Sequence, residues 1–331
     1  MNMIERESNN SASTTKRRLI VTCASLVVLS SAYLFGAYSY PRDLFPINII
    51  KAIKRFISPP VVTTPPVVNK FDSFGRLIFS SEKIEVTCPT QNEVTAVILA
   101  IGQSNSANSS PSKIPLKFGE NVFNYYDGKC YKASSPLLGA TGVGGEFITP
   151  LADKLIENNT YKNVVIVASG IGGTPISRWQ KDGDLNVMLL ETIKSLQRWI
   201  SSSSKLKTAY KPTQIVWHQG ESDFINKTSA NAYVSSFQSL KKSLNANNVS
   251  APFFISISTQ CNFQDWTMSN PTSNGQKALL QIKNIFLGAN TDILLGDSDR
   301  APDKCHFSES GLNKTAQSYA EAIIKSKTNG H

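Results

Sequence analysis

Histidine is scarce in this chain: only His218, His306 and the terminal His331 occur among its 331 residues. Chain ends are commonly frayed, so His218 and His306 are the candidates for an imidazole that exchanges a proton near neutral pH. His218 lies within an apolar stretch and can equally be a buried structural residue. His306 follows Asp303 by three positions, a spacing that brings a carboxylate and an imidazole to the same side of a helix or turn. A helix cap formed by Asp303 is the alternative reading of this pair.

The chain also has few cysteines and no block of basic residues with interleaved aromatic residues. No two cysteines have the spacing of a zinc site, which argues against a metal centre. The net charge of +10 is spread thinly, which argues against nucleic acid as a partner. There is no internal repeat. Beyond the N-terminal region the chain has an even number of cysteines, which allows two disulfides in any of three pairings: Cys88, Cys130, Cys261 and Cys305.

Long apolar runs are absent except near the N-terminus. Residues 19–38 carry no charge and follow a basic cluster at residues 16–18. The length matches a bilayer, and the basic flank is typical of the cytoplasmic side. We therefore expect a cytoplasmic basic tail over residues 1–18 and a transmembrane anchor over residues 19–40, with a cleavable signal peptide as the alternative.

The segment that follows is rich in proline. Residues 41–70 predict an extended membrane-proximal linker, and residues 71–331 predict one folded domain. Because disulfides persist outside the cytoplasm, we expect this domain to be exported. A bacterial inner membrane, with the domain facing the periplasm, is the preferred location, and a secreted protein is the alternative.

Within the predicted domain, apolar stretches alternate with amphipathic ones. Continuous apolar strands separated by helices indicate a parallel sheet covered on both faces. The sequence therefore predicts a three-layer α/β/α sandwich with about five parallel strands. The predicted strands are residues 96–101, 164–169, 214–219, 253–258 and 292–295, and the predicted helices are residues 146–158, 185–201, 230–246, 276–286 and 309–324.

The first three predicted strands end in residues that suit a catalytic site, at the edge where parallel sheets carry such sites. The first strand ends in Gly-Gln-Ser-Asn, which places Ser104 on the first turn after it. The second is followed by Gly172 and Gly173, whose N–H groups can approach a ligand closely. The third ends at Gln219. The N–H of Ser104, a glycine N–H and the Gln219 side-chain amide would together stabilise an oxyanion, although ordinary turns explain the same residues.

Taken in order, the motifs GQSN, GGTPISRW, WHQGESD and DKCHFS resemble those of the SGNH hydrolase superfamily. More narrowly, they resemble its sialate O-acetylesterase-like branch, related to carbohydrate esterase family six, over roughly residues 94–324. The resemblance implies a flavodoxin-like fold and no metal or organic cofactor. It implies a serine esterase that removes O-acetyl groups from a carbohydrate through an acetyl-enzyme intermediate. A carbohydrate O-acyltransferase and a catalytically silent glycan-binding protein are the alternative functions.

The resemblance also implies a role for each candidate residue. Ser104 is the expected nucleophile and His306 the expected base. Asp303 is the expected acid of the triad, with Glu221 as its rival. The expected oxyanion hole consists of the Ser104 N–H, a glycine of the Gly172–Gly173 pair and Gln219.

Further expectations concern the substrate and the disulfides. Arg178, Trp179 and the stretch 139–147 are candidates for contact with the sugar, with core packing as the alternative for Trp179. Alongside the resemblance, the favoured disulfides are Cys88–Cys130 and Cys261–Cys305. The second would hold the loop that carries Asp303 and His306, which preorganises the site by covalent restraint.

Overall fold

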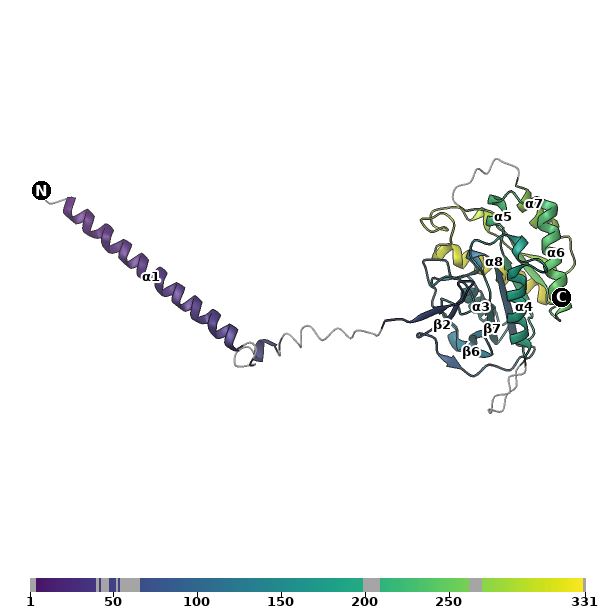
Figure 1. Ribbon diagram of the computed structural model, residues 1–331, viewed down its shortest axis with the longest axis horizontal. Coiled ribbons are helices and arrows are strands. Elements are labelled where there is room, and N and C mark those ends of the chain that lie inside the picture. Colours follow the sequence, from purple (N-terminus) through teal and green to yellow (C-terminus); the bar gives the residue numbers. More distant parts are fainter. Residues whose placement is uncertain are drawn as a thin grey trace. The chain divides into compact units, whose positions relative to one another are not determined.

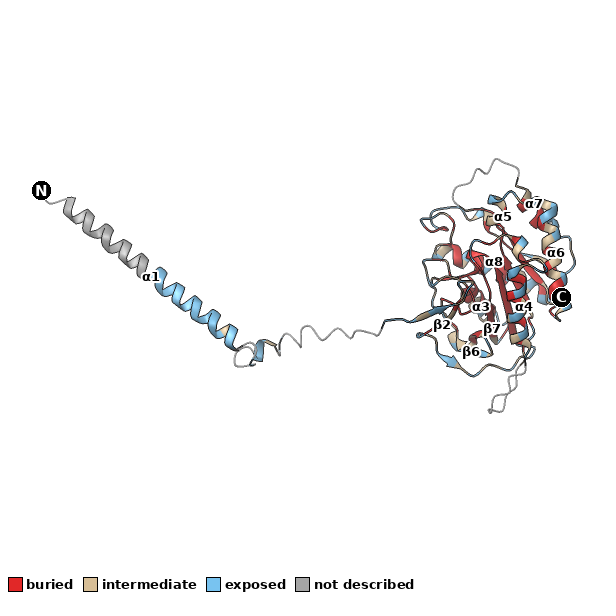
Figure 2. Ribbon diagram, in the orientation of Figure 1, coloured by how far each residue is buried: buried red, intermediate tan, exposed pale blue. Residues whose placement is uncertain are grey.

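The computed structural model describes residues 4–39, 42, 48–51, 53, 66–198, 209–261 and 270–329. The chain divides into two compact units, Met1–Pro66 and Val67–His331. Helix α1 (Ile4–Ser39) lies in the first unit. Its segment Val21–Tyr38 has a mean hydropathy of 1.6 and no buried residue (Figure 2), so it is long and apolar enough to cross a membrane. A signal sequence would have the same properties. Most of the predicted linker lies outside the described residues.

The second unit is built around an eight-stranded sheet (Figure 1). The neighbouring strands from β10 to β5 are all parallel, and β6 and β3 extend the sheet in antiparallel fashion. The order is β10 (Ile285–Asn290), β9 (Phe253–Ile257), β8 (Gln214–His218), β4 (Thr95–Gly102), β7 (Asn163–Ala168), β5 (Val122–Tyr126), β6 (Lys129–Lys132) and β3 (Glu85–Val86).

Strand β4 shows why the sheet is covered on both faces. All eight of its residues are buried, and successive side chains point to opposite faces. Val97, Leu99 and Ile101 pack into the core beneath α4 (Asp184–Gln197), α6 (Ala230–Ala246) and α7 (Pro271–Leu279). The smaller alternating set, which includes Ala96 and Ala100, packs into the core beneath α3 (Ile148–Glu157) and α8 (Glu309–Thr328). The predicted three-layer α/β/α sandwich is confirmed.

The sheet is larger than predicted at one edge and different at the other. Strands β5, β6 and β3 were not expected, and neither was the separate hairpin of β1 (Asn69–Phe71) and β2 (Leu77–Ser80), which begins inside the predicted linker. The strand predicted at residues 292–295 is wrong, since residues 291–293 form the short 3₁₀ helix η4. The strand there is β10, whose residues 285 and 286 were assigned to a helix. An edge strand is only half buried, and this one includes Gly288 packed on Tyr319.

The disulfide Cys88–Cys130 joins the chain just after β3 to strand β6. The second disulfide is Cys261–Cys305. This is the favoured pairing of the three that the sequence allows. Two disulfides in one domain are typical of proteins outside the cytoplasm.

Candidate active site

The chain leaves the central strand β4 through a close approach that only glycine permits. Gly102 has a φ of 130°, and a Cβ there would lie 2.1 Å from the carbonyl oxygen of His218 on the neighbouring strand β8. The Gln103 N–H then donates to the same carbonyl oxygen. The short 3₁₀ helix η1 (Ser104–Ser106) follows at once. Its first residue, Ser104, has no intrahelical acceptor for its N–H and is 8% exposed.

Gln103 fastens this turn to the loop after β8. Its Oε1 accepts hydrogen bonds from the N–H groups of Gly220 at 3.3 Å and Ser222 at 3.2 Å. These groups lie at the N-terminus of the short helix α5 (Glu221–Ile225), where N–H groups have no intrahelical partner. Gln103 therefore fixes the position of Ser104 relative to the loop after β8.

Asp303 and His306 lie in a tight turn before α8. The turn is closed by an antiparallel bridge between Arg300 and Phe307. Asp303 Oδ1 accepts from the N–H groups of Cys305 and His306, both at 3.0 Å, and Oδ2 lies 2.6 Å from His306 Nδ1. Burial would raise the pKa of Asp303, but these hydrogen bonds outweigh it and the pKa is lowered. The carboxylate is therefore ionised beside an imidazole whose side chain is 26% exposed.

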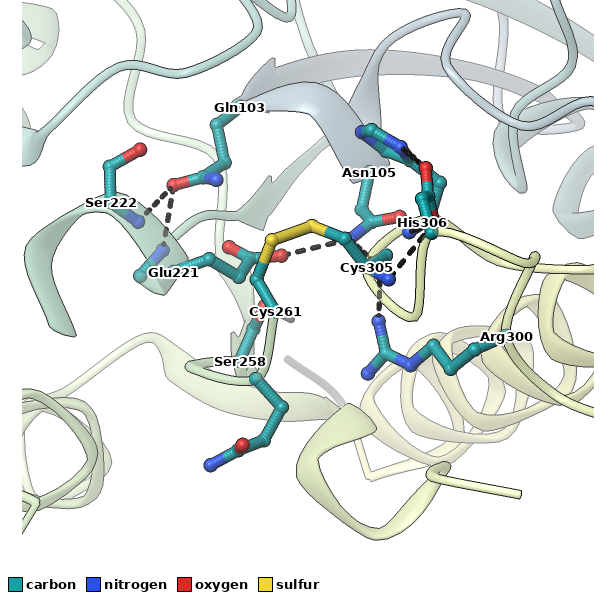
Figure 3. The surroundings of a disulfide bond; sticks show 12 residues. Gln103, Asn105, Glu221, Ser222, Ser258, Cys261, Arg300, Cys305 and His306 are labelled. Carbon is teal, nitrogen blue, oxygen red and sulfur yellow. Dashed lines mark hydrogen bonds and ion pairs between the residues drawn. A yellow bond between two sulfur atoms is a disulfide. The ribbon is translucent and has the colours of Figure 1, made fainter. Parts of the chain in front are cut away.

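Asn105 joins the turn that carries Ser104 to the turn that carries His306 (Figure 3). Its Nδ2 donates to Glu221 Oε1 at 2.9 Å and to the carbonyl oxygen of Cys305 at 3.2 Å. The residue after Ser104 thus contacts the residue before His306. Among the described residues, no hydrogen bond links the Ser104 hydroxyl to the His306 ring directly. The sequence reasoning missed Asn105, whose only signal was its place beside Ser104.

The glycine loop after β7 lies against the side chain of Ser104. A Cβ on Gly172 would be 3.6 Å from Ser104 Cβ, and the Gly172 N–H donates to Thr141 Oγ1 at 2.9 Å. Gly173 has a φ of 69° and open space around it. The structure therefore brings the predicted glycine pair to Ser104. It also shows that Thr141, within the stretch 139–147 predicted to contact the sugar, accepts a hydrogen bond from the Gly172 N–H.

The structure does not place Gln219 in the predicted oxyanion hole. Its side chain is fully buried. Nε2 donates to the carbonyl oxygen of Thr174 at 3.1 Å and to a carboxylate oxygen of Asp223, and Oε1 accepts from the Tyr233 hydroxyl at 2.9 Å. Both amide hydrogens are thus committed to internal acceptors, because a buried amide must be satisfied within the protein.

Glu221 contacts Asn105 and the region of His218, not His306. Its side chain is 1% exposed, and burial raises the pKa of its carboxyl group. Oε1 lies 3.8 Å from Nδ1 of His218. His218 is itself fully buried, with Nε2 at 3.2 Å from Thr291 Oγ1. Burial, assisted by the charge of Arg300, lowers the pKa of His218 to about 3, so this histidine is a neutral structural residue.

Two of the residues predicted to contact the sugar, Arg178 and Trp179, lie in different surroundings. Trp179 is fully buried, its ring 5.6 Å from that of Trp217, and Nε1 donates to Thr174 Oγ1. The side chain belongs to the core, which is the alternative that the sequence left open for Trp179. Arg178 ends the 3₁₀ helix η3 (Ile176–Arg178) and pairs with Asp184 through two hydrogen bonds of 3.1 and 2.6 Å.

The stretch 139–147 supports the loop that follows Ser104. Gly142, Gly144 and Gly145 lie so close to the backbone of residues 108–112 that a Cβ would clash. Glu146 is buried, and its Oε2 accepts from two N–H groups at the start of α3. These residues thus have structural contacts, whereas Val143 is exposed, and contact of the stretch with the sugar stays a prediction. Within the described residues there is no cluster of three or more side chains suited to a metal ion.

The parallel sheet, the serine after its central strand and the Asp303–His306 pair are features that a carboxylic ester hydrolase can use. Residues 94–325 match the family described as carbohydrate esterase, sialic acid-specific acetylesterase. The chain belongs to this family and is a carbohydrate O-acetylesterase. No curated protein sequence matches the chain.

Three solved structures are among those similar to this chain. A protein from Arabidopsis thaliana is 14% identical, with a TM-score of 0.52, and the match covers 72% of this chain and 99% of that one. NanS is 15% identical, with a TM-score of 0.48 and coverages of 72% and 99%. A carbohydrate acetylesterase from Xanthomonas citri is 14% identical, with a TM-score of 0.43 and coverages of 68% and 54%. At such identities, the likeness to the Arabidopsis protein supports the fold alone.

Proposed function

We propose that Ser104 is the nucleophile that removes the O-acetyl group and that His306 and Asp303 activate it. Ser104 attacks the acetyl carbonyl carbon while His306 Nε2 takes up the hydroxyl proton. The imidazolium is stabilised by Asp303, which bonds Nδ1. His306 then gives the proton to the departing sugar hydroxyl, and water repeats the sequence on the acetyl-enzyme. The observation that carries the proposal is the Asn105 bridge, which joins the neighbours of Ser104 and His306.

The oxyanion would be held by main-chain donors. The Ser104 N–H lies at the start of η1, and residue Gly172 lies beside the Ser104 side chain. The Gly172 N–H is engaged with Thr141 Oγ1, so it has to be shared or released when the oxyanion forms. Gln219 instead stabilises the loop after β7 through its hydrogen bond to the Thr174 carbonyl oxygen. Losing one such donor typically costs roughly 10²–10³-fold in rate.

An exported, membrane-anchored enzyme is the cellular setting we propose. The apolar helix segment Val21–Tyr38 would form the anchor behind the basic residues 16–18, and residues 71–331 would form the catalytic domain. The two disulfides suit the periplasm better than the cytoplasm. An O-acetylated sialic acid is the first substrate to test, because the family is described by this specificity.

The test compares the full chain, purified in detergent, with its Ser104→Ala variant. We expect the wild-type protein to release acetate from an aryl acetate and from at least one of O-acetylated sialic acid, acetylated xylan or an acetylated cell-envelope polysaccharide. The variant should lose at least roughly 10³-fold in kcat. Equal rates would refute the proposal. Transfer of acetyl to an added sugar in preference to water would instead identify an acyltransferase, and sugar binding without acetate release would identify a silent binding protein.

A further inference from the structure

Arg300 is a buried cation that the proposed mechanism does not use. It is 4% exposed. Burying a guanidinium is costly unless its N–H groups are satisfied. All three of its hydrogen bonds go to main-chain carbonyl oxygens: Nε to Leu294 at 2.7 Å, Nη1 to Cys305 at 2.6 Å and Nη2 to Thr291 at 2.7 Å. Its guanidinium also lies 4.6 Å from the centre of the Phe307 ring.

One of these acceptors, the Cys305 carbonyl oxygen, directly precedes His306 in the chain. The Cys305 carbonyl oxygen belongs to the peptide unit that joins Cys305 to His306. It accepts from Arg300 Nη1 on one side and from Asn105 Nδ2 on the other (Figure 3). The donation from the guanidinium is the shorter of the two, as expected for a charged donor. This peptide unit is thus fixed between a residue of its own turn and the neighbour of Ser104.

The other two acceptors tie the same guanidinium to the sheet edge. Thr291 begins η4, directly after β10, and Leu294 follows η4. Arg300 therefore connects the turn that carries His306 to the segment that follows the edge strand β10. A planar fork of donors suits this task, whereas a lysine ammonium acts as a single point.

On the proposed function, we infer that Arg300 is a positioning residue for His306: through the Cys305 carbonyl it sets the imidazole relative to Ser104. Arg300 has no contact of its own with the reacting atoms in this mechanism. Its removal leaves the Asp303–His306 pair intact but lets the turn move against the nucleophile. A displacement of about 1 Å can cost roughly 10²-fold in rate. KM should change little, because substrate binding does not depend on the position of the His306 ring.

The experiment measures kcat and KM for an aryl acetate with the full chain in detergent, for wild type, Arg300→Gln, Arg300→Lys and Ser104→Ala. We expect Arg300→Gln to lower kcat by about 10²-fold with KM within about threefold of wild type. Arg300→Lys, which keeps the charge and one donor, should recover about tenfold of that loss. If Arg300→Gln does not fold, Arg300→Lys alone is expected to show about a tenfold lower kcat.

The matched control is Ile193→Val, a core substitution in α4, away from the turn that carries His306. It lowers stability without touching the turn. Wild-type kcat in the folded Arg300 variants would overturn the inference. The inference would also fail if Ile193→Val lowered kcat as much at the same reduction in thermal midpoint. It would fail, too, if Arg300→Lys had as low a kcat as Arg300→Gln. If Ser104→Ala keeps the wild-type rate, the proposed function itself fails, whatever the Arg300 variants do.

Discussion

Oδ2 of Asp303 lies 2.6 Å from Nδ1 of His306, whereas the rival carboxylate of Glu221 accepts its hydrogen bond from Asn105 at 2.9 Å. The two acids thus take different positions around the same pair of turns. Asp303 contacts the imidazole, and Glu221 bonds Asn105, the residue next to Ser104. Asp303 also accepts two main-chain N–H groups of its own turn, which fixes its orientation toward the ring.

The first prediction separates these two carboxylates. Asp303→Asn should lower kcat by roughly 10⁴-fold, because an amide favours the wrong tautomer of the imidazole. Glu221→Gln keeps an oxygen that can accept from Asn105 Nδ2, so its effect on kcat should be much smaller. Steady-state kinetics on an aryl acetate measure both. A large loss in Glu221→Gln with a small loss in Asp303→Asn would make Glu221 the acid of the triad.

The sequence predicted the fold best where a single pattern dominates. Strand β4 is apolar from Ala96 to Ile101, and helix α6 has one clear apolar face, so both were located closely. Strand β10 was misplaced because it lies at the edge of the sheet, with Leu287 exposed and Gly288 accommodating Tyr319. Strands β5 and β6 form a hairpin closed by Asp127 and Gly128, a local turn signal that was overlooked. Strand β3 pairs with β6 from a distant part of the chain, which local periodicity does not encode.

The site was predictable as motifs but not as contacts. The Asp303–His306 pair follows from a spacing of three residues, and Gly172 follows from its place after β7. The inward direction of the Gln219 side chain has no signature in the sequence. The Asn105 contacts join residues 116 and 200 positions apart, which only the folded chain brings together. Motifs therefore identify candidates for the chemistry, whereas the Asn105 contacts that join them were not predictable.

The second prediction uses the two adjacent glycines as a matched pair. In Gly172→Ala the new Cβ makes ordinary contacts, the nearest at 3.5 Å with Thr141 and 3.6 Å with Ser104. The variant should therefore fold normally but lose about 10²-fold in kcat/KM, because the methyl group lies where the acyl group has to approach. Gly173→Ala has open space but a φ of 69°, so it should lose roughly 1–2 kcal/mol of stability.

Kinetics and thermal unfolding of both variants test this pair. Wild-type activity in Gly172→Ala would mean that the acyl group does not approach Gly172 during the reaction. An equal loss of stability in both variants would mean that the backbone at residue 172 also needs glycine.

The third prediction concerns pH and stability through His218. Burial lowers the pKa of this histidine to about 3 in the folded protein, against about 6.5 in the unfolded chain. Between these values the unfolded state binds the extra proton, so stability falls as pH falls, by up to about 1.4 kcal/mol per pH unit. Above pH 6.5 this contribution is fully present. Glu221, whose pKa burial raises, acts with the opposite sign.

The measurement is the free energy of unfolding between pH 4 and pH 7 for wild type and His218→Gln. Glutamine keeps a donor for Thr291 but does not titrate. The difference between the two proteins isolates His218 from Glu221 and from the other carboxyl groups. We expect the wild-type protein to lose stability more steeply toward pH 4. Parallel curves would mean that His218 accepts a proton as readily in the folded protein as in the unfolded chain.

The last prediction compares the two disulfides, which close loops of nearly equal length. Cys88–Cys130 spans 42 residues and Cys261–Cys305 spans 44. Chain entropy therefore predicts a similar stabilisation from each, about 4 kcal/mol. Only the second lies in the turn between Asp303 and His306, where it joins Cys305 to the loop that follows β9. Replacing either pair by alanine should lower stability alike, but only Cys261→Ala with Cys305→Ala should also lower kcat.

Denaturant unfolding and kcat of the two double variants give the comparison, with the other disulfide intact in each. The alanine at position 305 keeps the carbonyl that Asn105 and Arg300 bond, so the fall in kcat should be partial, about tenfold rather than complete. A fall of the same size in Cys88→Ala with Cys130→Ala would attribute it to lost stability. An unchanged kcat in both would mean that the hydrogen bonds to the Cys305 carbonyl are sufficient to hold the base in place.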